Sequence, residues 1–224
     1  MSNFGLSTPS GELKGEFNTY KPSEPIPVES YGLLPQLQWN NGKACVPVAI
    51  TNALAGMAAY YKERRLLLNG ADSHDQLLNT YRRLALDLNT KSEGLGTDEK
   101  GILEGMPKFL DSQGLNNILS WYPQSGSTDG DQLFITLIAA FAKGPVVFFD
   151  EYDGGGGHAV TAAQIEFNDV NNNMRLDKGE AYITVIDPLN PAKGKEYTPK
   201  NLDVSGLTDD EKLQRWNETI QAGP

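Results

Sequence analysis

The chain has 224 residues and a mass of 24.5 kDa, which is enough for one compact domain with its own hydrophobic core. Its 19 Lys and Arg against 29 Asp and Glu give a formal net charge of -10, and no basic cluster is longer than a pair, which argues against nucleic acid or an anionic membrane as the partner. The single cysteine excludes an internal disulfide, and no apolar run approaches the length of a membrane span.

Residues 1–30 hold four prolines among Ser, Gly, Glu and Lys, and such a composition does not bury enough surface to become ordered by itself. We expect an extended arm there, or a propeptide. The N-terminus also lacks the charged start and apolar stretch of a secretory signal, so we expect either an intracellular protein or one whose signal has been removed.

The first half of the chain has the spacing of helices. Apolar residues recur at intervals of three and four over residues 47–68 and again over residues 73–88, which predicts two amphipathic helices. A third helix is expected to begin at residues 97–99, where Thr-Asp-Glu suits a helix start with acidic residues in the first turn. A further helix is predicted over residues 129–143.

The hydrophobic period changes after Gly144. Segments rich in β-branched and aromatic residues predict strands over residues 145–152, 158–167 and 180–188, with a weaker one over 195–199. Helices followed by strands are typical of an α+β fold with an antiparallel sheet. We expect one domain over residues 31–200, with the tail 201–224 belonging to the same domain.

Four phrases, in chain order, resemble papain-like cysteine peptidases, especially the double-glycine (bacteriocin-processing) peptidase family and its relatives. They are QLQWNNGKACVPVAITNAL (36–54), GTDEKGILEGMPKFLDSQGL (96–115), KGPVVFFDEY followed by GGGGHAV (143–152 and 154–160), and TVIDP (184–188). The resemblance covers residues 33–190 and implies a papain-like fold, with the nucleophile on an N-terminal helical half and the His and Asp on a C-terminal antiparallel sheet. The chain departs from the family at Val46, where the family has Gly directly after the cysteine.

The question at Cys45 is whether it is a core residue or a nucleophile. At a helix start, its sulfur would lie beside unpaired backbone N–H groups and the positive end of the helix dipole, which favour a thiolate. His158 follows four glycines at a strand start and is the better base, because His74 lies in the polar helix start SHDQ.

The resemblance gives the remaining roles. It implies that Asp187 orients the imidazole, and a hairpin between two antiparallel strands would bring Asp187 back beside His158. The alternative is that Asp187, before a proline, only ends a strand. The resemblance also implies an oxyanion donor, Gln38, acting with the Cys45 N–H, although Gln36 is close enough to compete.

We therefore expect a cysteine peptidase, a hydrolase that cleaves peptide or protein substrates through a Cys-His-Asp triad and a thioester acyl-enzyme. Transglutaminases and amidases use the same triad and are the first alternative. A non-catalytic, calcium-stabilised binding module on the same scaffold is the second. No organic cofactor is expected, and the oligomeric state stays open.

The segment DVNNNMRLDKGE, residues 169–180, lies between two predicted strands and resembles the EF-hand calcium loop. The ligand positions are taken by Asp169, Asn171, Asn173, the carbonyl of Arg175, Asp177 and Glu180. Met174 stands where that loop has glycine, and strands replace the flanking helices. We favour a structural calcium ion over a plain Asn/Asp-rich turn. The modest affinity of such a site suits a secreted or cell-surface protein whose signal was removed, and a cytoplasmic location is expected otherwise.

Overall fold

The computed structural model describes residues 18–20, 31–32, 34, 42–92, 96–119, 144–151, 157–167, 181–188 and 201–203. The helices within them are α1 (Cys45–Tyr61), α2 (Ser73–Asp87), α3 (Glu99–Ser112) and a short 3-10 helix (Arg64–Leu66). The strands are β1 (Asn18–Tyr20), β2 (Val146–Glu151), β3 (Gly157–Phe167), β4 (Ala181–Ile186) and β5 (Asn201–Asp203). The chain is therefore α+β, as the order of helical and strand patterns predicts.

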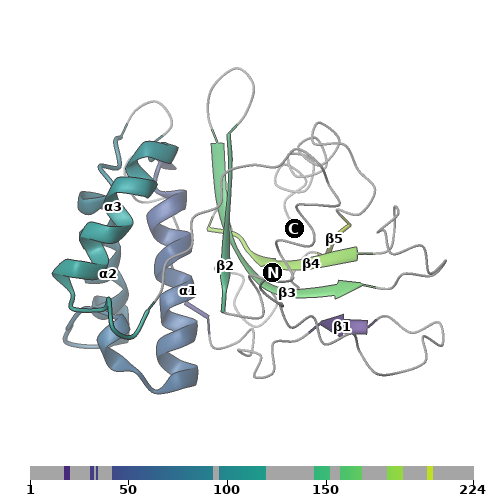
Figure 1. Ribbon diagram of the computed structural model, residues 1–224, viewed down its shortest axis with the longest axis horizontal. Coiled ribbons are helices and arrows are strands. Elements are labelled where there is room, and N and C mark those ends of the chain that lie inside the picture. Colours follow the sequence, from purple (N-terminus) through teal and green to yellow (C-terminus); the bar gives the residue numbers. More distant parts are fainter. Residues whose placement is uncertain are drawn as a thin grey trace, which may run out of the picture.

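Helix α1 is the central helix of the described part. Twelve of its 17 residues are buried, as expected of a helix that is apolar on nearly all sides. Figure 1 shows α1 between the sheet and the pair formed by α2 and α3. The helix starts two residues before the predicted Pro47 and stops at Tyr61, because Lys62 turns into the left-handed conformation and residues 64–66 form a separate turn.

Helices α2 and α3 begin at aspartate caps. The Asp75 N–H donates to Asp72 Oδ1 at 2.8 Å, and the Gly101 N–H donates to Asp98 Oδ1 at 2.7 Å. The start of α3 is thus fixed by Asp98, whereas Thr97 is buried and its hydroxyl bonds to that of Thr90. The helix predicted over residues 129–143 lies outside the described residues.

The sheet is antiparallel and is built around the long strand β3. Strand β4 pairs with one edge of β3, and β2 and β1 pair with the first and last parts of the other edge. The strands predicted over 145–152, 158–167 and 180–188 are confirmed to within two residues at their ends. Residues 18–20, which we expected in an extended arm, pair with β3 as β1, and β5 pairs with β4. The strand predicted over 195–199 lies outside the described residues.

The sheet and α1 are joined by apolar packing and by one buried hydroxyl. Ala159 of β3 belongs to the same hydrophobic cluster as Cys45, Ala49 and the apolar side chains of α2 and α3. The Thr161 hydroxyl donates to the Ala49 carbonyl of α1 at 2.7 Å. Within the described residues, no helix is both long and apolar enough to cross a membrane.

Residues 31, 32 and 34 lie along α1, in order toward its N-terminus. The Leu34 N–H donates to Asn52 Oδ1 at 2.9 Å, and Asn52 Nδ2 donates to the Leu34 carbonyl at 3.2 Å. Tyr31 packs against the C-terminal half of α1, beside Gly56, while Leu34 packs against Ala44 and Val48 at the N-terminal end. The buried amide of Asn52 therefore fixes this segment to the helix that begins with Cys45.

Candidate active site

Cys45 is the first residue of α1, and the start of this helix is uncapped. The N-cap residue is Ala44, which offers no side-chain hydrogen bond, and the first turn holds no acidic residue. The two neighbouring helices each begin at an aspartate instead. A carboxylate cap at α1 would oppose negative charge on the sulfur, so the uncapped start keeps the positive end of the helix dipole for Cys45.

His158 and Asp187 come from neighbouring strands. His158 is the second residue of β3, and Asp187 directly follows β4. Ile186 is the Cα partner of Thr161, and carrying this register one residue further sets Asp187 opposite Val160, on the same face of the sheet as His158. The His158 Nε2 and Asp187 Oδ1 atoms lie 2.7 Å apart. The return of Asp187 to His158 across the hairpin, expected from the sequence, is thus present.

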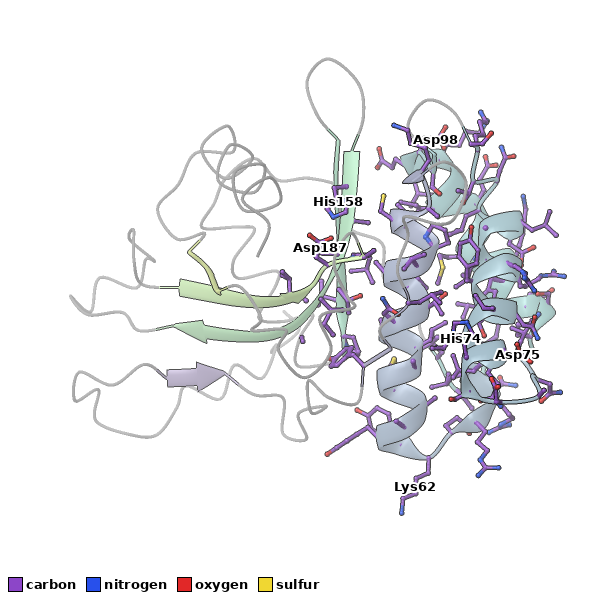
Figure 2. The ribbon with its side chains drawn as sticks, turned by 180° about the vertical axis from the view of Figure 1, so that it is seen from behind. Lys62, His74, Asp75, Asp98, His158 and Asp187 are labelled. Carbon is purple, nitrogen blue, oxygen red and sulfur yellow. The ribbon has the colours of Figure 1, made fainter. Side chains whose placement is uncertain are left out.

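Figure 2 shows His158 and Asp187 close together, at the level of the end of α1 opposite to Lys62. Because Lys62 follows the C-terminus of α1, this is the end where Cys45 begins the helix. His74 is exposed in the first turn of α2 and lies well away from His158 and Asp187 in the same view. The structure therefore brings His158, and not His74, to the cysteine.

The protonation of His158 depends on both of its partners. Burial, the largest influence, lowers the pKa of the ring. Side-chain hydrogen bonds and charge interactions with Asp187 and Cys45 raise it by more, so that the pKa of His158 stands at about 9 against an ordinary 6.5. The carboxylate and the sulfur thus both favour the protonated form of the ring.

The His158 ring has two side-chain partners. Its Nε2 lies 2.7 Å from Asp187 Oδ1, and the ring also forms a side-chain hydrogen bond with Cys45. A cation held against a sulfur at a helix N-terminus stabilises a thiolate, the form of cysteine that attacks carbonyl carbons. The same ring then holds a proton that it can deliver to a leaving group.

The site is shielded from solvent. Cys45 is 4% exposed and His158 is 5% exposed, while the Asp187 side chain is 16% exposed. Shielding strengthens the electrostatic interactions among the three groups relative to an open surface. Cys45 also packs in the hydrophobic cluster of α1, as a core residue would. Its contact with His158 is what the nucleophile hypothesis requires.

Val46, where the chain departs from the family, lies inside α1 and is buried. Among the described residues, positive φ outside glycine occurs only at Lys62 and Asn89. A glycine after the cysteine is therefore not required by the backbone here.

Gly96 packs against the turn that precedes Cys45. Gly96 has a φ of +77°, and a Cβ there would lie 2.2 Å from the Lys43 carbonyl oxygen, so only glycine fits this close approach. Gly96, Asn52 and Thr161 were not among the predicted site residues. Gly96 and Thr97 begin the second of the four phrases, but there they were interpreted only as part of a helix start.

Other predicted site residues lie outside the described residues. They are both oxyanion candidates, Gln36 and Gln38, and all six positions of the calcium loop, Asp169, Asn171, Asn173, Arg175, Asp177 and Glu180. Among the residues that are described, no group of three or more His, Cys, Asp or Glu side chains is placed to hold a metal ion.

Comparison of the chain with protein-family models, with curated proteins and with solved structures found no match. The resemblance to papain-like peptidases therefore rests on the four local phrases. The site has to be interpreted from its own geometry.

Proposed function

We propose that the protein is a cysteine peptidase of papain-like arrangement, with Cys45 as nucleophile, His158 as acid and base, and Asp187 as the group that orients the ring. One observation carries the proposal. A buried imidazole lies 2.7 Å from a carboxylate through Nε2 and also forms a hydrogen bond with the chain's single cysteine, at an uncapped helix start. A buried thiol with a merely structural role needs no contact with an imidazole that a carboxylate holds in place.

The chemistry follows the arrangement. The Cys45 sulfur attacks the peptide carbonyl carbon, and the negative charge that develops on the oxygen is stabilised by the Cys45 N–H together with Gln38. His158 then gives its proton to the amine as the C–N bond breaks, which leaves a thioester. The neutral ring next removes a proton from water, which attacks the thioester. The acid product leaves, and the thiolate and imidazolium are restored.

Product analysis tests this proposal and separates it from its closest alternative. The protein is incubated with a mixture of peptides, and the products are identified by mass spectrometry, with Cys45→Ser as the inactive control. New termini formed by the wild type alone support a peptidase. Cross-links, or loss of ammonia without backbone cleavage, point to a transglutaminase or an amidase, and an unchanged mixture contradicts the proposal of an enzyme.

We also propose that residues 169–180 hold a structural calcium ion. The support is the ligand pattern of the sequence, together with the pairing of Phe167 with Ala181, the described residues on either side of this segment. An ion there would stiffen the hairpin that carries both His158 and Asp187. Calcium should then raise the melting temperature by a few degrees over a chelator control. Glu180→Gln should reduce the difference, and identical melting with and without calcium would contradict the site.

A further inference from the structure

The distance between His158 and Cys45 depends on how β3 lies along α1. Thr161 stands three residues after His158 in β3, and Ala49 stands four residues after Cys45 in α1. The Thr161 Oγ1 donates to the Ala49 carbonyl at 2.7 Å, and the Thr161 side chain is fully buried. The hydroxyl thus links β3 to α1 within four residues of both His158 and Cys45 along the chain.

Helix α1 and strand β3 are joined at two points, so that together they form a closed ring. One turn of α1 leads from Cys45 to Ala49, a rise of about 6 Å, and β3 leads from Thr161 back to His158 over about 10 Å. The Thr161–Ala49 hydrogen bond closes one end of the ring, and the His158–Cys45 contact closes the other. Because the helix and the strand are stiff, a slide of β3 along α1 would disturb both ends together.

A hydroxyl at this place is not explained by packing alone. The nearest residues on the same face of β3 are Ala159 and Ala163, which are apolar and buried. A valine has nearly the same shape as threonine but lacks the hydroxyl, and a buried hydroxyl is unfavourable unless it finds an acceptor. The threonine therefore contributes a directional contact that an apolar residue does not supply.

We propose that Thr161 is a positioning residue, whose hydroxyl fixes β3 on α1 so that the His158 ring meets the Cys45 sulfur. This inference rests on the proposed roles of Cys45 and His158. Its consequence is that loss of the hydroxyl weakens the activation of Cys45 more than it weakens the fold.

The test uses the rate of Cys45 alkylation by iodoacetamide across pH, with urea unfolding of each variant as the measure of stability. Thr161→Val should slow alkylation at neutral pH by about tenfold or more, since a displacement near 1 Å has large effects on reacting groups. Thr161→Ser keeps the hydroxyl and should retain most of the rate. If the valine variant does not fold, Thr161→Ala against Thr161→Ser provides the same comparison.

Thr51→Val is the matched control. Thr51 is also fully buried, and its Oγ1 donates to the Pro47 carbonyl at 2.7 Å, but this bond stays within α1. The control should lose a similar amount of stability and keep the alkylation rate. An unchanged rate in Thr161→Val, or an equal loss of rate in Thr51→Val, would overturn the inference. If His158→Ala alkylates as fast as the wild type, the proposed function fails as well.

Discussion

Burial alone would lower the pKa of the His158 ring, yet the pKa is raised to about 9. Two partners reverse this effect, Asp187 on one side and Cys45 on the other. The choice of Cys45 and His158 as candidates was possible because the chain has one cysteine and two histidines, whereas the role expected for Asp187 came from the resemblance. Thr161 and Asn52 were not predictable, since threonine and asparagine are common and their roles depend on which distant carbonyl or N–H each one meets.

The raised pKa makes stability depend on pH. The pKa of His158 is about 9 in the folded state and 6.5 as the ordinary value, so protonation favours the folded state. This contribution, roughly 3 kcal/mol, is fully present below pH 6.5 and is lost as the pH rises through 9. Urea unfolding from pH 6 to pH 10 should show the decline in the wild type.

The variant His158→Gln should lose this part of the pH dependence, whereas His74→Gln should keep it because His74 is exposed in α2. If both variants retained the wild-type slope between pH 6.5 and 9, the proposed charge on His158 would be wrong.

Helix ends, rather than helix interiors, decide the character of the site. The start of α3 was predicted from Thr-Asp-Glu at residues 97–99, where Asp98 is the cap, whereas the Asp72 cap of α2 was not predicted. The start of α1 was placed two residues late, at Pro47, because a helix start with no capping side chain leaves no such signal. The uncapped start is the feature that leaves Cys45 beside the positive end of the helix.

Asn52 is the element-level contact with the clearest energetic consequence. Replacing it by leucine removes both partners of the Leu34 backbone, N–H and carbonyl, in a buried place. We expect the free energy of unfolding to fall by roughly 2 to 4 kcal/mol. Chemical denaturation measures this directly.

Asn79→Ala is the control for Asn52. Asn79 Nδ2 donates to the Asn69 carbonyl at 2.8 Å, but at an exposed position where water can replace it. We expect a loss below about 1 kcal/mol there. Equal losses in the two variants would show that the amide of Asn52 does not hold residues 31, 32 and 34 on α1.

The molecule as a whole joins a helical layer to an antiparallel sheet, and the proposed site lies where they meet (Figures 1 and 2). The α+β class followed from local periodicity, because helix and strand patterns are separated along the chain. The pairing of residues 18–20 with residues 165–167 did not follow, since contacts between distant segments leave no local pattern. The contact between Cys45 and His158 also joins distant segments, so residue spacing alone did not predict it. It was expected only from the resemblance.

The most direct test of the central claim is the rate at which iodoacetamide alkylates Cys45 between pH 5 and pH 9. An ordinary thiol is half ionised only near pH 8.5, whereas a thiolate paired with an imidazolium reacts well below that value. We predict that the wild type and His74→Ala alkylate at pH 6 about tenfold or more faster than His158→Ala. If the wild type instead follows the profile of an ordinary thiol and His158→Ala matches it, the sulfur and the ring do not act as a pair, and the proposed peptidase mechanism is wrong.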